Sequence, residues 1–221
     1  MGIPSRQATV LLVVSLSAVI ATVSVLRSGP QGATIAFWFD RISDDTLQTL
    51  PERFGRAIDA PELATIESIA TAEIAHAFQD FRIAFTSPAA AVYRIRVVDT
   101  LRIPTAPWAP GPSAESRSIP GLGGQGAVNF RLMAHSAIAF APADADRAAI
   151  IAGIGRGIGR AAVHEFTHQL LGTTPIHDTT DVRSYEYASA SRVEQYYGEM
   201  RWDIARPFIV ERIGLKVGSA R

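Results

Sequence analysis

Nineteen consecutive residues, from Ala8 to Leu26, carry no charge, and this run limits the folds open to the chain more than any other feature. It reads ATVLLVVSLSAVIATVSVL and lies between Arg6 and Arg27. A helix needs about 20 apolar residues to span a bilayer, whereas the apolar part of a signal peptide runs for about 7 to 15. The length therefore favours a retained membrane anchor over a cleaved signal peptide. The globular part of the chain must be built from the residues that follow.

The sequence predicts three parts. Residues 1–27 form a signal anchor or signal peptide, residues 28–33 a linker, and residues 34–221 one folded domain. A chain of this size can bury a substantial core in one domain. We expect the domain to be anchored outside the cytoplasm through residues 8–26, or else to be secreted or periplasmic.

Composition excludes some classes of partner and ligand. The chain has 21 basic and 21 acidic residues, so its formal net charge is zero and no charge excess favours nucleic acid or an anionic membrane face. It has no cysteine, which excludes disulfides and thiolate ligands. Any metal must be held by His, Asp or Glu.

The first half of the domain predicts a strand, a helix and two more strands. Residues 34–39 form a short apolar run, and residues 61–81 place apolar side chains at helical spacing after a proline. Residues 83–85 and 92–98 read as further strands, the second with alternating apolar and charged positions. The fold class indicated is α+β, with a small twisted mixed sheet and a backing helix.

The second half predicts a long connection and a long helix. Residues 104–126 are rich in Pro, Gly and Ser, which is typical of a mobile flap or of a loop near the site. Residues 128–130 and 137–140 read as short strands, arranged as a hairpin at the sheet edge. A helix is expected over residues 144–171, capped by Asp144 or Asp146. Its four alternate glycines match no nucleotide-binding pattern and indicate close packing against a neighbouring strand.

That helix carries the pattern HExxH at His164, Glu165 and His168. Because the two histidines are four positions apart in a helix, both imidazoles lie on one face and can bind one zinc ion. Glu165, beside them, is placed to take a proton from a zinc-bound water as that water attacks a carbonyl carbon. An apolar approach to the motif indicates a helix buried under a sheet and not a solvated one.

A third ligand is expected shortly after the helix. Gly172 can end the helix in a left-handed cap, and Pro175 prevents its continuation. His177 then follows, and we assign it as the third zinc ligand. Asp178 and Asp181 are expected behind it, where a carboxylate can orient a ligating imidazole.

These motifs resemble those of the metzincin peptidases, whose signature is HExxHxxGxxH. The His-Asp pair at His177 and Asp178 is similar to the ending found in the adamalysin branch. The spacing departs from the signature, because Gly172 comes one residue later and His177 three residues later. The resemblance implies a metzincin-like fold over residues 34–213 and a methionine turn beneath the zinc at Met200.

The function indicated is that of a zinc endopeptidase, with an extended peptide adding to the sheet edge near residues 137–140. Two alternatives stay open: a membrane-tethered binding protein with a structural zinc site, and a gluzincin-like peptidase with a downstream glutamate ligand. The candidate glutamates are Glu186, Glu194 and Glu199. Candidates for an oxyanion-stabilising hydroxyl are Tyr185, Tyr187, Tyr196 and Tyr197, which otherwise pack. His76 and His135 are interpreted as structural.

Overall fold

The computed structural model describes residues 31–50, 52–102, 111–119, 122–172 and 176–218. The anchor expected at residues 1–27 and the first three residues of the expected linker lie outside the described residues. Within the ranges described, no helix is both long and apolar enough to cross a membrane.

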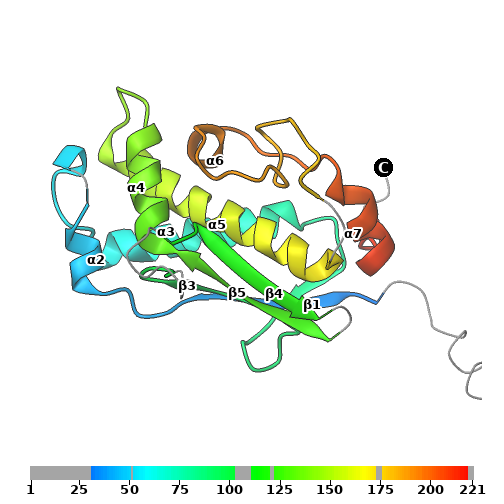
Figure 1. Cartoon of the computed structure of the whole chain (residues 1–221). Helices are drawn as coiled ribbons and strands as arrows, with labels where there is room; N and C mark the ends of the chain where they lie inside the picture. The colour runs from blue at the N-terminus through cyan, green and yellow to red at the C-terminus, as the bar shows by residue number, and fades with distance from the viewer. Residues whose placement is uncertain (1–30, 51, 103–110, 120–121, 173–175, 219–221) are drawn as a thin grey trace, which may run out of the picture.

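A five-stranded mixed sheet forms one layer of the domain, with strand order β2-β1-β3-β5-β4 (Figure 1). Four strands run parallel, and the edge strand β4 runs antiparallel to β5. The strands are β1 (Ala33–Phe39), β2 (Ile83–Phe85), β3 (Tyr93–Val98), β4 (Ala114–Ile119) and β5 (Gly123–Asn129). A mixed sheet packed against helices was expected and is confirmed. Because parallel pairing dominates, the fold is α/β and not α+β.

Helices form the second layer, on one side of the sheet (Figure 1). They are α2 (Asp44–Gln48), α3 (Ala60–Ala77), α4 (Phe130–Phe140), α5 (Arg147–Leu171), α6 (Glu194–Tyr197) and α7 (Ala205–Ile213), with a 3-10 turn at Glu52–Phe54. Between the layers lies a continuous apolar core. The long helix α5 runs across the sheet and supports the candidate site.

The sequence encodes the start of α3. Asp59 accepts a hydrogen bond from the Glu62 backbone N–H, and the Glu62 side chain accepts one from the Asp59 N–H, which forms a capping box. Pro61 occupies the first turn, where a missing N–H costs nothing. The predicted helix is confirmed, but it ends at Ala77 and not at residue 81.

Helix α5 begins after Asp146, whose side chain accepts a hydrogen bond from the Ala149 N–H. Its glycines let neighbours approach closely. A Cβ at Gly159 would lie 2.6 Å from the Ala70 carbonyl oxygen of α3, and one at Gly157 would lie 2.4 Å from the Tyr196 ring. The expectation of close packing is confirmed, although the neighbours are a helix and aromatic rings instead of a strand.

Two predictions around residues 104–140 are wrong. Residues 137–140 are the last turn of α4 and not a strand, because Asn129 caps a helix by accepting a hydrogen bond from the Leu132 N–H. Phe130 already belongs to that helix, so only residues 128 and 129 of the predicted strand are extended. In the segment at 104–126, residues 104–110 and 120–121 lie outside the described residues, whereas residues 114–119 form β4 and residues 123–126 open β5. Backbone pairing at the sheet edge orders these polar residues.

Candidate metal centre

Three histidine side chains meet at one point beside α5. His164 and His168 come from one face of the helix, with their Nε2 atoms 3.1 Å apart. His177, from the segment after the helix, places its Nε2 atom 3.1 Å from that of His168 and 3.2 Å from that of His164. The structure therefore brings together the three histidines assigned as ligands from the sequence, in a group able to hold a metal ion.

The spacing of these nitrogens fits zinc. Tetrahedral zinc with zinc–nitrogen bonds of about 2.1 Å separates its nitrogen ligands by about 3.4 Å. The His164 Nδ1–H donates to the Tyr185 carbonyl oxygen over 2.8 Å, which fixes the proton on Nδ1 and leaves the Nε2 lone pair free. Three converging imidazole nitrogens with an anchored tautomer form a donor set typical of zinc.

The electrostatic surroundings favour neutral imidazoles. Burial lowers the pKa of His164 to about 4, against the hydrogen bond to the Tyr185 carbonyl and with the help of His168 and His177. Burial, followed by the proximity of His177, also lowers the pKa of His168. Both shifts favour the deprotonated ring, which is the form of histidine that a metal binds.

Glu165 points from α5 toward the edge strand and is 8% exposed. Burial raises the pKa of its carboxyl group, a hydrogen bond with Ser116 of β4 lowers it, and the charge of Glu115 raises it again. The general base expected from the sequence is thus a buried acid held against β4. A raised pKa brings such a group closer to the pH at which it exchanges protons.

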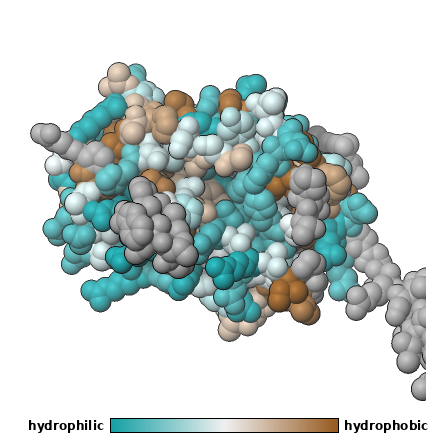
Figure 2. Space-filling view, in the orientation of Figure 1, coloured by the Kyte–Doolittle hydropathy of each residue, from teal (hydrophilic) through white to brown (hydrophobic). Residues whose placement is uncertain are grey.

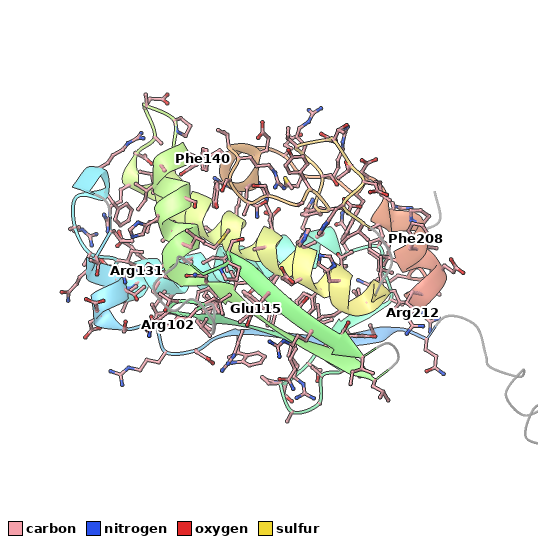
Figure 3. All side chains as sticks on the ribbon, in the orientation of Figure 1. Arg102, Glu115, Arg131, Phe140, Phe208 and Arg212 are labelled. Atoms are coloured by element: carbon pink, nitrogen blue, oxygen red, sulfur yellow. The ribbon has the colours of Figure 1, made fainter. Side chains whose placement is uncertain are left out.

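The histidines and Glu165 line a cavity of about 600 Å³ between β4 and the chain that follows α5. Figure 3 places Glu115 on β4, alongside α5. The wall on the β4 side is formed by residues 112–116 and Ser118, and the opposite wall includes Tyr185, Tyr187, Ala188, Ala190, Arg192 and Gln195. A strand edge therefore borders the three histidines directly.

The two aspartates expected behind His177 differ in their surroundings. Asp178 is exposed and is not one of the grouped ligand residues, and its role beside His177 remains a prediction. Asp181 pairs with Arg201 at 2.6 Å and with Arg183 at 3.8 Å. A second-sphere role for Asp181 at the histidines is not supported by these contacts, because its carboxylate is engaged by arginines.

The downstream glutamates are also separate from the histidine group within the described chain. Glu186 is fully buried and accepts hydrogen bonds from Ser184 and from the backbone N–H groups of Asp203 and Ala205. Its carboxylate therefore holds the loop before α7. Glu194 begins α6, and Glu199 is exposed.

The four candidate tyrosines divide into two pairs. Tyr185 and Tyr187 line the cavity. Tyr196 is buried with its hydroxyl 3.9 Å from the Met133 sulfur, and the Tyr197 hydroxyl donates to the Ala137 carbonyl. Packing is confirmed for the second pair, and a hydroxyl role at the site remains a prediction for the first.

Three other residues were singled out from the sequence. His135 contacts the Thr49 carbonyl oxygen over 3.0 Å, which agrees with a structural role, and His76 is exposed. Met200 is half-buried against the core. Its place beneath a metal ion remains a prediction.

Two groups that contact the site residues were not predicted from the sequence. The Tyr185 carbonyl that fixes His164 is a backbone atom, which any residue type supplies. Ser116, which contacts Glu165, lies in a stretch read as an irregular connection. Recognising AESRSI as an alternating strand would have placed Ser116 and Ser118 on one face.

Comparison with protein-family models, with curated proteins and with solved structures finds no match to this chain. The α/β fold and the three-histidine group therefore rest on the chain's own residues. The group can hold a metal ion such as zinc.

Proposed function

We propose that this protein is a zinc-dependent peptidase, with His164, His168 and His177 as the zinc ligands and Glu165 as the general base. One observation carries the proposal: three Nε2 atoms lie 3.1 to 3.2 Å from one another beside a buried glutamate and an open cavity. Three protein ligands with room for water are typical of catalytic zinc sites.

Each residue has a chemical task in this proposal. Zinc would supply a Lewis acid that lowers the pKa of water toward about 7 and polarises a carbonyl group. Glu165 accepts a proton from the attacking water at its carboxylate and returns it to the leaving amine. Its raised pKa suits both steps, because the group must hold the proton between them.

The edge strand supplies a place for the substrate. The edge expected at residues 137–140 is part of helix α4, so a peptide cannot pair there. Strand β4 is the outer strand of the sheet, paired on one side with β5 and bordering the cavity with residues 114–116 and Ser118. An extended peptide that adds to this edge would pass the histidines.

A metzincin-like arrangement is part of the proposal. The order β1, α3, β2, β3 agrees with the strand, helix, strand, strand order implied by the resemblance. Gly172 ends α5 with φ at 63°, a region that favours glycine, and lets the chain turn toward His177. The turn is longer than the signature requires, yet His177 still reaches the other two ligands.

A membrane-tethered binding protein with a structural zinc ion is the second candidate. A structural site is usually closed by four protein ligands. In the described chain the group contains three histidines, which favours catalysis. A gluzincin-like site is less favoured, because Glu186 is occupied by the loop before α7.

The deciding experiment compares the full-length chain with Glu165→Gln. Both should bind about one zinc per chain by elemental analysis, while hydrolysis of a peptide library should fall by roughly 10²- to 10⁴-fold in the variant. Glu199→Gln, at an exposed position away from the histidines, is the matched control and should keep full activity. Equal hydrolysis by wild type and Glu165→Gln would exclude the proposed base. Zinc binding without hydrolysis by any form would favour the binding protein.

A further inference from the structure

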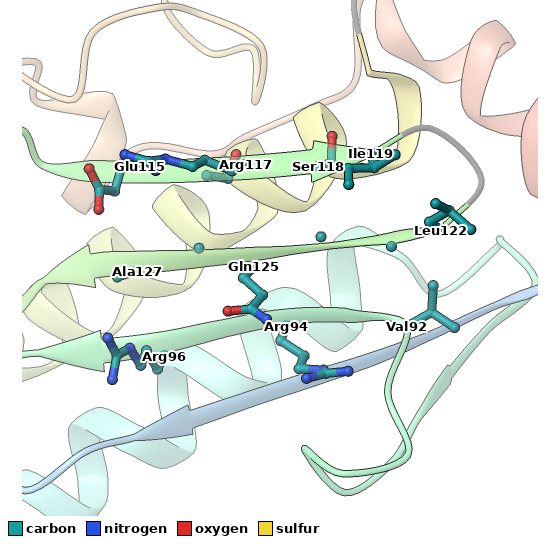
Figure 4. A pocket seen from close by; sticks show the side chains of 14 residues that line it. Val92, Arg94, Arg96, Glu115, Arg117, Ser118, Ile119, Leu122, Gln125 and Ala127 are labelled. Carbon is teal, nitrogen blue, oxygen red and sulfur yellow. The ribbon is translucent and has the colours of Figure 1, made fainter.

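The face of the sheet turned away from the helices carries a second hollow, of about 620 Å³ (Figure 4). Its floor is β5, with the small residues Gly123 and Ala127 on either side of Gln125. Its walls are β3 on one side and β4 on the other. The groove therefore lies on the opposite face of β4 from the histidines.

Two arginines lie at the same level of this groove, one on each wall. Arg117 of β4 and Arg94 of β3 are both paired in register with Gln125, so their Cα atoms are about 10 Å apart. Neither forms an ion pair within the described chain, although Glu115 lies on the same face two residues from Arg117. The Arg94 Nε–H donates to the Ala91 carbonyl oxygen over 3.0 Å, which leaves its terminal amino groups for a ligand. Arg96, by contrast, is paired with Asp40 at 3.1 Å.

One end of the groove is apolar. Val92, Ile119 and Leu122 are 42%, 63% and 78% exposed. They lie together at the end where β4 meets β5, as Figure 4 shows, and Figure 2 shows hydrophobic atoms gathered at that edge of the molecule. Large apolar side chains that cluster in solvent mark an interaction surface.

The same end of the sheet is where the chain enters the domain. The Val92 N–H donates to the Thr34 carbonyl oxygen over 3.2 Å, so the apolar end adjoins the start of β1. The uncharged run ends at Leu26, and six residues separate it from Ala33. An extended connection of that length reaches at most about 25 Å. If residues 8–26 enter a membrane, this end of the sheet is held close to it.

We propose that this end of the domain docks on an anionic bilayer surface. Val92, Ile119 and Leu122 enter the interfacial region, and Arg94 and Arg117 bind lipid phosphates behind them. Apolar side chains flanked by cations are the combination that holds proteins to anionic membranes. The proposal goes beyond the peptidase function and rests on the expected membrane segment, not on zinc.

The chain has no cysteine, so one introduced thiol can carry an environment-sensitive fluorophore. Full-length Leu122→Cys would be labelled and reconstituted in vesicles of phosphatidylcholine alone or mixed with phosphatidylglycerol. Ala139→Cys, exposed on α4 at the far end of the molecule in Figure 1, is the control. In the anionic vesicles we expect blue-shifted emission and quenching by nitroxide lipids at residue 122, with neither at residue 139.

The charge requirement is tested with Arg94→Gln/Arg117→Gln in the Leu122→Cys background. Losing two cations near the surface should weaken docking roughly 30-fold. Circular dichroism would check the fold of this variant and of Leu122→Cys, in which an apolar fluorophore takes the place of the leucine side chain. A label at residue 122 as exposed to water as that at residue 139, or a chain that does not float with either vesicle, would overturn the proposal. A blue shift at residue 122 that appears only when an acidic protein is added, and not with anionic vesicles alone, would also overturn it. None of these readouts depends on hydrolysis, so the result stands whether or not the chain is a peptidase.

Discussion

His177 is the residue on which the metal centre depends most, because it is the ligand that comes from outside α5. It is exposed, yet its Nε2 atom lies within 3.2 Å of both other ligand nitrogens. We predict that His177→Ala weakens zinc binding by more than roughly 100-fold, since two imidazoles leave the ion short of ligands. Competition with a chromogenic chelator measures the change.

Asp178→Asn is the matched control for that substitution. Asp178 is the next residue and equally exposed, but it stands outside the histidine group. Its variant should keep the zinc affinity of the wild type within a few fold. A large loss with Asp178→Asn and none with His177→Ala would transfer the ligand role to the aspartate.

Most residues of the candidate site could be predicted from residue types and their spacing, whereas the backbone contacts of the site could not. His164, Glu165 and His168 are readable because helical spacing fixes their relative positions in advance. His177 followed from the need for a third ligand within reach of a helix that ends at Gly172. The Tyr185 carbonyl leaves no trace in the sequence, since its position depends on how a long irregular segment folds back over α5.

At the scale of elements, the glycines of α5 set how closely it approaches α3. We predict that Gly159→Ala lowers the free energy of unfolding by about 1 to 2 kcal/mol, because the overpacking outweighs the helix propensity gained. The new Cβ would meet the Ala70 carbonyl oxygen, which is backbone and cannot move aside. Urea unfolding followed by circular dichroism measures the difference.

Gly153→Ala serves as the comparison within the same helix. There the Cβ would meet the far end of the Tyr197 ring, a half-buried side chain that can shift. Its loss should be the smaller of the two. An equal or larger loss at Gly153 would mean that contact with α3 does not limit the packing of α5.

The start of α5 is fixed to α3 by a charged pair with a defined pH dependence. Arg147 donates to Glu62 over 2.6 Å, and this hydrogen bond lowers the pKa of the Glu62 carboxyl group to about 2, against the effect of burial and with help from the Asp59 backbone. The stabilisation is therefore complete above the unfolded pKa of about 4.5 and is lost as the pH falls toward 2.

We predict that Glu62→Gln lowers the free energy of unfolding by about 1 to 2 kcal/mol at pH 7, with allowance for partial solvent screening. The difference from wild type should shrink steadily between pH 4.5 and pH 2. Urea unfolding across that range measures it. A difference independent of pH would assign the effect to lost packing or capping instead of charge.

Helices and strands with regularly spaced apolar residues could be predicted from the sequence. Strands that depend on backbone pairing with a neighbour could not. Strand β1 and helices α3 and α5 each bury a regular set of apolar residues, which the sequence displays. Strand β4 has polar residues on both faces and is ordered by its ladder with β5. The sequence therefore read it as part of the Pro-, Gly- and Ser-rich segment that surrounds it. The end of α4 read as a strand because four apolar residues without a polar face suit either state.

At the scale of the whole molecule, strand β4 separates two surfaces. Ser116 faces Glu165 and the histidines on one side, whereas Arg117 lines the groove of Figure 4 on the other. A domain docked through the apolar end, with Arg94 and Arg117 toward the lipid phosphates, would therefore leave its histidine cavity on the face of β4 that does not contact the bilayer. In this arrangement the two proposals are compatible, and a peptide in solution could reach the free edge of β4.

Metal binding should also raise the stability of the whole domain. The three histidines join α5 to the segment that follows it in the chain. An ion that binds only the folded state stabilises it by mass action, by about 4 kcal/mol at a free concentration 1,000 times Kd. For a domain of this size we predict that zinc raises Tm by roughly 8 to 16 °C over the chelated protein. Differential scanning calorimetry of the full chain measures the shift, which His177→Ala should remove and Glu165→Gln should keep. An unchanged Tm in the wild type would show that the three histidines do not hold zinc in the folded chain.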